Sequence, residues 1–234
     1  NAGAQTFTVT LGTSSCTFPV TVAAPATIDY FPRTVNSNWS YELDDVATDS
    51  LLLKVINNTV TAGGNTYQTF METFDASGVP PFDTSGYYRK AANDYYQWSN
   101  LVDYLYFDAP QWQSWIFLKD NQPVGTSWYS STGGFTGSVG GTPAVIRIKY
   151  TILQKDVSVS VTTSTGTVNY PNTISVEEKY ELQSGPLWLP LDATFGYYIN
   201  YYSRNIGQVK LEYFDGTGGV TPTNVLKLRR KFIL

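Results

Sequence analysis

The sequence has no histidine among its 234 residues and only one cysteine, Cys16. Without histidine the chain cannot form a Ser-His-Asp triad, a Cys-His pair, a His-ligated zinc site or an imidazole proton shuttle. A single cysteine excludes an internal disulfide and a cysteine-rich metal centre. The chain also lacks a Gly-rich phosphate loop and a nucleophile elbow. These absences predict a protein that is not an enzyme, with no catalytic residues, no metal and no cofactor.

Charged residues are scarce as well. They make up 15% of the chain, against about 25% in a typical soluble domain. The formal net charge is −4, so no overall positive field attracts nucleic acid or an anionic membrane. The longest apolar run, residues 50–56, is interrupted by Lys54, whereas a membrane-spanning helix needs roughly 18 apolar residues. We therefore expect neither a nucleic-acid partner nor a membrane span.

Aromatic residues are abundant: 18 Tyr, 12 Phe and 6 Trp account for 15% of the chain. The remaining composition is rich in Thr, Ser, Asn and Gly and poor in Lys, Glu, Cys and Met. Such a composition is typical of an exported protein. It predicts an exported protein.

The dominant sequence pattern is alternation of polar and apolar residues, which indicates β-strands. Residues 6–11 and 16–22 alternate on either side of a turn at 12–15, which predicts a hairpin. Pro19 cannot donate a ladder hydrogen bond, so the second strand is expected at a sheet edge. Residues 23–26 then have the composition of a linker. We expect two units, an N-terminal hairpin at 1–24 and a barrel or roll at 25–234.

Further alternating segments follow from Tyr30 to the end, separated by Gly-rich turns. The longest, residues 145–163, predicts either two strands or one long bent strand broken near Lys155 and Asp156. The best helix candidate is 99–108, which fits a strand equally well. The predicted fold class is all-β: an antiparallel meander forming a barrel, half-barrel or roll, with a separate N-terminal hairpin. The other expected strands are 38–43, 51–60, 66–74, 87–90, 95–98, 104–107, 114–118, 127–131, 174–182, 197–202, 208–214 and 225–234.

Residues 35–39 and residues 124–128 have similar sequences. Both read Val, turn former, hydroxyl, polar, Trp, and both follow a proline. Asn36 and Gly125 are the residues suited to a tight turn with positive φ. We expect Trp39 and Trp128 to point inward and anchor the strand that follows each turn.

Residues 30–41, Tyr-Phe-Pro-Arg-Thr-Val-Asn-Ser-Asn-Trp-Ser-Tyr, resemble a segment of uncharacterised secreted proteins and lipoproteins of Gram-negative bacteria. Those proteins open a β-rich domain with "YFPL-x-VGN-x-W-x-Y" and carry a "Y-x-Y-apolar-x-GVGLVK" strand before the last hairpin. Residues 201–210 correspond to that strand, and the resemblance runs in order from Tyr30 to Leu234. The chain departs from it at Asn36 and at 205–207. The resemblance implies a secreted or cell-envelope location, either periplasmic or as a surface lipoprotein, and implies no known reaction.

The N-terminal hairpin resembles the closing hairpin of a bacterial Ig-like surface module. A complete module needs about 100 residues, so the resemblance implies that this segment is the tail of an upstream module.

The densest aromatic region is 87–128, where five aspartates are interleaved with Tyr and Trp. Sugars stack on exposed Trp and Tyr rings flanked by carboxylates and amides, so this region is the candidate ligand-binding site. Packing of a large β core explains the same residues, and we favour that interpretation. Residues three apart in a strand face opposite ways, so Trp112 and Trp115 share a face only in a turn or helix. The candidate ligand-binding residues are Trp98, Trp112, Trp115, Tyr95 and Tyr96.

A second tyrosine-rich segment spans residues 195–202. Alternation places Tyr198, Asn200 and Tyr202 on one face and residues 197, 199 and 201 on the other. One face is expected in the core, and the other is either a binding surface or solvated.

Glu177 and Glu178 are adjacent in the sequence. In a strand they would point to opposite faces, which argues against a catalytic pair of carboxylates.

Three functions remain open from sequence. The leading hypothesis is an exported, non-catalytic binding or structural module of the cell envelope with an unknown ligand. A carbohydrate-binding module of a surface glycan-handling system is the first alternative. A carboxylate-only glycosidase, or a lipid carrier if the roll encloses an apolar cavity, is the second. The expected partner is correspondingly open between a polysaccharide and another envelope protein.

Overall fold

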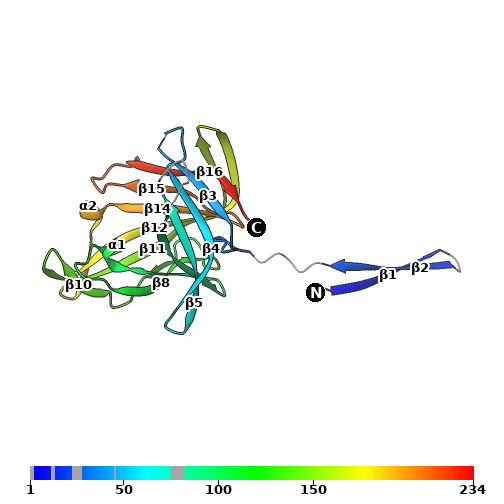
Figure 1. Ribbon diagram of the computed structural model, residues 1–234, viewed down its shortest axis with the longest axis horizontal. Helices are drawn as coiled ribbons and strands as arrows, with labels where there is room; N and C mark the ends of the chain where they lie inside the picture. The colour runs from blue at the N-terminus through cyan, green and yellow to red at the C-terminus, as the bar shows by residue number, and fades with distance from the viewer. Residues whose placement is uncertain (1–2, 12–13, 23–27, 45, 75–81) are drawn as a thin grey trace.

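The computed structural model describes residues 3–11, 14–22, 28–44, 46–74 and 82–234, and almost all of its regular structure is β-strand (Figure 1). Strands dominate because Val, Ile, Thr, Tyr and Phe suit a pleated, half-buried surface. The elements in chain order are β1 (Gly3–Leu11), β2 (Ser14–Val22), β3 (Asn38–Leu43), β4 (Leu51–Ala62), β5 (Asn65–Thr73), β6 (Asp83–Ala91), β7 (Asp94–Asn100), α1 (Leu101–Leu105), β8 (Trp112–Lys119), β9 (Ser127–Tyr129), β10 (Phe135–Val139), β11 (Thr142–Thr163), β12 (Gly166–Ser184), β13 (Leu187–Pro190), α2 (Asp192–Phe195), β14 (Tyr197–Ser203), β15 (Gly207–Phe214) and β16 (Asn224–Phe232).

The strands from β3 onward form one antiparallel sheet that curls into a nearly closed barrel (Figure 1). Two meanders build it, with strand orders β3-β4-β5-β6-β7-β8 and β10-β11-β12-β14-β15-β16, while short β9 and β13 pair with β11 and β12. Antiparallel pairing of β16 with β3 joins the two meanders. The predicted all-β meander forming a barrel is thus confirmed.

The remaining gap in the barrel lies between β8 on one side and β9 and β10 on the other. Two tryptophans bridge it. Trp128 Nε1 on β9 donates to the Ile116 carbonyl on β8 at 2.9 Å, and Trp115 Nε1 on β8 donates to the Tyr150 hydroxyl on β11 at 2.9 Å. Indole hydrogen bonds therefore connect the two sheet edges where the ladder between strands is interrupted.

The two predicted tryptophan anchors are present. Asn36 and Gly125 adopt positive φ of 71° and 86°, the region in which Asn and Gly are the least strained residues. Trp39 and Trp128, which follow these turns, are 2% and 8% exposed. Each buries its ring and donates its Nε1 proton to a backbone carbonyl. The expectation that both indoles point inward is confirmed.

The predicted segment 145–163 is a single long strand, β11. Its pairing with β12 is interrupted by three register shifts between Ile152 and Val159, and Asp156 has a positive φ of 54°. Register shifts of this kind bend a strand. The prediction of one long bent strand is confirmed, with the break at Asp156.

The predictions for several elements were wrong, and β10 and β13 were not among the predicted strands. The strand expected at 174–182 begins at Gly166, because Pro171 lies in the irregular stretch of β12 where no ladder donor is needed. The segment 104–107 is not a strand. It contains the last residues of α1. Asn100 caps the beginning of this helix, because its side chain accepts a hydrogen bond from the Val102 backbone N–H.

The predicted N-terminal hairpin is also present. Strands β1 and β2 pair over their full lengths in a two-stranded antiparallel sheet separate from the barrel sheet. The expected boundary between the two units, at 24 and 25, lies outside the described residues. No helix in the part of the chain that the structure describes has the length and apolar character needed to cross a membrane.

Phe31, in the segment before β3, inserts its ring across the barrel interior. Its ring centroid lies 5.2 Å from that of Phe70, 4.9 Å from Tyr88, 5.3 Å from Phe117 and 6.2 Å from Tyr202. These partners come from β5, β6, β8 and β14. One aromatic ring therefore ties together strands from both meanders and closes the interior at that level.

Candidate functional site

The barrel is not completely filled: it contains a cavity of about 320 Å³. We call it the interior cavity. Residues from both meanders and from α1 line it, and most of them are polar or aromatic. The lining includes the carboxyl residues Glu72, Asp103 and Glu178, the amides Gln97, Asn200 and Gln208, and the tyrosines Tyr41, Tyr88, Tyr104, Tyr106, Tyr180, Tyr198 and Tyr202.

The interior cavity has a floor and a mouth. Phe31 is part of its lining and forms the floor, because its ring spans the barrel between β5, β6, β8 and β14. Asp103 and Tyr106 are the exposed members of the lining, and Tyr106 is 59% exposed. The cavity therefore meets solvent beside α1. A site of this kind, concave and mostly preformed, is the usual form of a small-ligand pocket.

Glu178 reaches the cavity because of the alternation of β12. Ile174, Val176 and Tyr180 point into the barrel and are buried, so the residue between Val176 and Tyr180 on the same face is Glu178. Burial raises the pKa of its carboxyl to about 7, because the charged form loses hydration in the protein interior. Its side chain nevertheless keeps some accessible surface, since the cavity reaches it.

A chain of hydrogen bonds holds the Glu178 carboxyl in place. The Tyr180 hydroxyl donates to its Oε1 at 3.1 Å, and the Asn200 amide also donates to it. Asn200 is fixed in turn, because Gln208 Nε2 donates to its Oδ1 at 2.7 Å. A carboxylate offers about four acceptor positions, so Glu178 retains capacity for a ligand donor.

Strand β14, which pairs with β12 and places Tyr198 directly beside Glu178, supplies the adjacent part of the wall. Tyr198, Asn200 and Tyr202 all line the cavity, which confirms the predicted grouping of these three residues on one face. Burial raises the pKa of Tyr198 to about 12. Its hydroxyl therefore stays protonated and remains a hydrogen-bond donor throughout the physiological pH range.

Helix α1 places Tyr104 over the cavity. Gln97 Nε2 donates to the Tyr104 hydroxyl, and burial raises the pKa of Tyr104 to about 12. Tyr88, from β6, also hydrogen-bonds to Tyr104. The short helix thus carries Asp103, which is exposed at the opening of the cavity, and Tyr104, which hydrogen bonds hold in the cavity wall.

None of the five sequence-predicted ligand residues lines the interior cavity, and three of them lie on the outer side of the sheet. Trp98 and Trp112 pack together with ring centroids 4.7 Å apart, and Tyr87 joins them at 5.1 Å from Trp98. Trp112 is 47% exposed. We call Tyr87, Trp98 and Trp112 the outer aromatic cluster, because neighbouring Tyr88 and Gln97 face the cavity on the opposite side of the sheet. Tyr96 is half-buried beneath the Arg89 guanidinium at 3.6 Å.

The other two predicted residues, Tyr95 and Trp115, are buried at 0% and 2% exposure. In the core, the ring of Trp115 contacts Tyr104 in an edge-to-face arrangement and Phe135 in a tilted one. It therefore faces away from Trp112, although only two residues separate them on β8. The structure brings Trp98 and Trp112 together and separates both from Trp115 and Tyr95.

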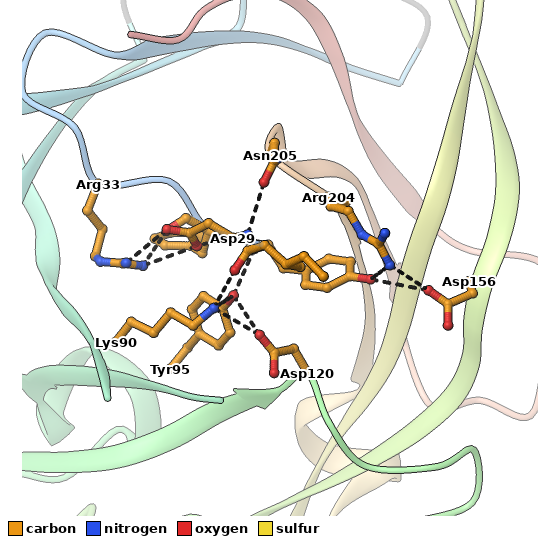
Figure 2. Close-up of polar contacts among 11 residues, drawn as sticks. Asp29, Arg33, Lys90, Tyr95, Asp120, Asp156, Arg204 and Asn205 are labelled. Carbon is orange, nitrogen blue, oxygen red and sulfur yellow. Dashed lines mark hydrogen bonds and ion pairs between the residues drawn. The ribbon is translucent and has the colours of Figure 1, made fainter. Parts of the chain in front are cut away.

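Tyr95 belongs to a polar network at the end of the barrel where the chain enters (Figure 2). Lys90 Nζ donates to the Ile28 carbonyl, the Tyr95 hydroxyl and Asp120 Oδ2 at 2.7, 2.6 and 2.9 Å. The Tyr95 hydroxyl accepts from the Tyr30 N–H at 2.8 Å. Figure 2 shows these groups converging on one another, so the network holds residues 28–30 against β6 and β7.

Beside this network lies a wide depression of about 900 Å³. Arg33 pairs there with Asp29 at 2.9 Å and Arg204 with Asp156 at 3.2 Å, while Lys155 Nζ donates to the Gln122 carbonyl at 3.2 Å. Because these polar groups already have partners within the chain, we take the interior cavity as the candidate functional site.

The sequence matches no known protein family and none of the curated proteins with which it was compared. Among solved structures, it is similar to a Bacteroides fragilis protein with a YmcC-like fold that is thought to be exported. The two share 14% identity, the match covers 88% of this chain and all of the other, and the TM-score is 0.48. We therefore base the function on the residues of this chain alone.

The sequence did contain one signal for the site that our predictions did not use. Residues 174, 176, 178, 180 and 182 form the inward face of β12, and four of the five are Ile, Val, Tyr and Leu. Glu178 is the exception. A carboxyl on an otherwise apolar face is costly to bury and therefore marks a position with a specific role.

Proposed function

We propose that this protein is an exported, non-catalytic binding module of the cell envelope, and that its ligand occupies the interior cavity. One observation supports this most strongly: the cavity of about 320 Å³ combines aromatic walls with carboxyl and amide groups. That volume lies at the lower end of the range of small-molecule sites, about 300 to 1,000 Å³. The ligand is therefore a small molecule or one residue of a larger one.

The absence of catalysis is supported by the surroundings of Glu178. The chain has no histidine, so acid–base chemistry would need paired carboxyl groups. Glu72 and Asp103 also line the cavity, but the groups that hydrogen-bond to Glu178 are a tyrosine hydroxyl and an amide, and neither of these two acids is among the groups that shift its pKa. Its sequence neighbour Glu177 instead pairs with Lys179 at 3.2 Å. We do not propose lipid carriage either, because carboxyl and amide groups in the wall do not suit an acyl chain.

Export is supported by the composition, which is rich in Thr, Ser and Tyr and poor in Lys and Cys. The segment 30–41 adds the resemblance to secreted proteins and lipoproteins of Gram-negative bacteria. The N-terminal hairpin β1–β2 extends this proposal, as the tail of an Ig-like module would link the barrel to a longer surface protein.

Binding in the cavity is testable by thermal unfolding with a panel of monosaccharides, disaccharides and small amines. A ligand at 100 times its Kd stabilises by about 2.7 kcal/mol, which raises Tm by roughly 5 to 10 °C in a chain of this size. We expect at least one compound to do so. We expect the shift to be lost in Leu226→Trp, which fills the cavity from β16.

Leu189→Trp is the matched control, because Leu189 lies on β13, is 44% exposed and does not line the cavity. It should keep the wild-type shift. Far-UV circular dichroism verifies that both variants are folded. A panel without any stabilising compound, or equal shifts in the filled variant and the wild type, would contradict the proposal.

A second candidate function is carbohydrate binding at the outer aromatic cluster. The observation that favours it is the exposure of Trp112 next to Trp98, since exposed indoles are common stacking surfaces for ligands. A cluster site of this kind would bind a sugar ring outside the barrel. Its ligand would thus be independent of the interior cavity.

An oligosaccharide that binds there should quench tryptophan fluorescence, and Trp112→Ala should weaken its binding at least tenfold. Trp188→Ala is the control, because Trp188 lies on β13 under Arg147 and outside the cluster. A glycan array without a hit, or equal binding by both variants, would exclude this second function.

A further inference from the structure

The ionisable side chains of the interior cavity are all acidic or phenolic. Glu72, Asp103 and Glu178 line it together with tyrosines, and the described residues of the lining include no lysine and no arginine. We propose that the interior cavity binds a small organic cation, an amine or a quaternary ammonium group, with Glu178 as its counter-ion. This inference rests on the proposed function, because it names the ligand class of the same site.

Other buried carboxylates among the described residues have a cationic side chain close by, and Glu178 differs from them in this respect. Asp120 lies 2.9 Å from Lys90 Nζ. Asp49 lies 3.0 Å from Arg229, which also lies 3.9 Å from Glu42. Each of these side chains is at most 7% exposed and has a cationic partner within the chain.

Glu178 has hydrogen-bond donors, but the part of the cavity wall that the structure describes places no cation beside it. Burying a carboxylate without an opposite charge is expensive. The fold therefore places cationic side chains beside its structural carboxylates. Glu178, which faces an open space, has no such cationic side chain in the described cavity wall. A bound organic cation would complete the pair.

The walls suit such a ligand as well. Rings of Tyr104, Tyr180, Tyr198 and Tyr202 line the space around the carboxyl. The faces of aromatic rings attract cations, and cages of aromatic rings with a carboxylate are a common way to hold amines and quaternary ammonium groups. Asp103 at the mouth and Glu72 in the wall add negative potential along the entry path.

Cation binding should also release a proton. Glu178 interacts electrostatically with tyrosine hydroxyls from four elements. These are Tyr150 of β11, Tyr180 of β12, Tyr198 and Tyr202 of β14, and Tyr104 of α1. Glu72 and Asp103 are the remaining acids of the lining. Because burial raises the pKa of Glu178 to about 7, this carboxyl is mostly protonated at pH 6. On binding a cation it passes its proton to solvent and pairs as the carboxylate.

Choline and 3,3-dimethyl-1-butanol provide a matched test, because they have the same shape and differ only in charge. Choline does not titrate, so any proton released on binding comes from the protein. By isothermal titration calorimetry at pH 8, we expect choline to bind at least tenfold more tightly than the neutral alcohol. At pH 6, titrations in buffers of different ionisation enthalpy should show close to one proton released per choline, and none at pH 9.

Glu178→Gln should reduce the preference for choline at least fivefold and abolish proton release. Glu177→Gln is the matched control, since Glu177 is the adjacent residue on the opposite face, paired with Lys179. It should behave as the wild type does. Glutamine has the size of glutamate and keeps one acceptor oxygen, so both variants should fold.

The outcomes separate the two proposals. If the neutral alcohol binds as tightly as choline, the cation inference is overturned and cavity binding stands. If neither binds while a sugar from the thermal panel does, the cation inference fails in the same way. If choline, the alcohol and the whole panel fail to bind, the proposed function itself is refuted.

Discussion

Glu178→Gln is expected to stabilise the unliganded protein by about 3 kcal/mol at pH 8. Burial raises the pKa of this carboxyl from 4.5 to about 7, and each tenfold change in proton affinity corresponds to about 1.4 kcal/mol. The folded state holds the proton more tightly than the unfolded state does. Stability associated with this group is therefore complete below pH 4.5 and is lost as the pH rises to about 7.

The variant removes that loss, because glutamine stays neutral at every pH. The difference in unfolding free energy between variant and wild type should be near zero at pH 4.5, grow through pH 6, and level off above pH 7. Urea unfolding at these pH values measures it. Glu177→Gln should change stability by no more than about 0.5 kcal/mol, as expected for a surface substitution. A difference that does not vary with pH would show that the pKa of Glu178 is the same in the folded and unfolded states.

Trp115→Ala is expected to lower the free energy of unfolding by about 4 kcal/mol. Trp115 is 2% exposed and packs against Tyr104 and Phe135, and truncation of a buried Trp costs about 3 to 5 kcal/mol. The change also removes the donor to the Tyr150 hydroxyl, which loosens the junction between β8 and β11.

Trp112→Ala is the matched control on the same strand. Trp112 is 47% exposed, and among the aromatic side chains that the structure describes it contacts only the outer aromatic cluster, so it should cost no more than about 1 kcal/mol. Chemical unfolding of both variants measures the difference. Similar losses for Trp112 and Trp115 would mean that the outer face contributes as much as the core.

Local sequence patterns predicted local geometry well. Asn36 and Gly125 suited positive φ before an inward Trp, and both turns have that form. Alternation also grouped Tyr198, Asn200 and Tyr202, which share the cavity wall. These predictions succeeded because each depends on a few adjacent residues and on the two-residue period of a strand.

The interior cavity could not be predicted in the same way. Glu72, Asp103 and Glu178 come from β5, α1 and β12, and no spacing along the chain indicates that they line one space. Their meeting depends on the register of strand pairs throughout the barrel, including the shifts at bulges in β5, β11 and β14. A shift of one residue would reverse the faces, so the site follows from the whole sheet.

The aromatic residues of 87–128 illustrate the same limit. Their abundance predicted either core or binding surface, and the structure divides them between the two faces of the sheet. Tyr95 and Trp115 are core residues, whereas Trp112 is exposed. Composition cannot make this division, because Trp and Tyr suit both the interior and the surface of a β-sheet.

The pairing of β16 with β3 has a consequence for how the chain folds. Tyr41 is paired with Leu228, so the strand ladder that joins the two meanders pairs residues from opposite ends of the barrel sequence. Such non-local pairing makes folding slow. Until β16 arrives, β3 presents an open strand edge, and open edges template aggregation. A chain that cannot complete its barrel early therefore keeps the edge of β3 open to other chains for longer.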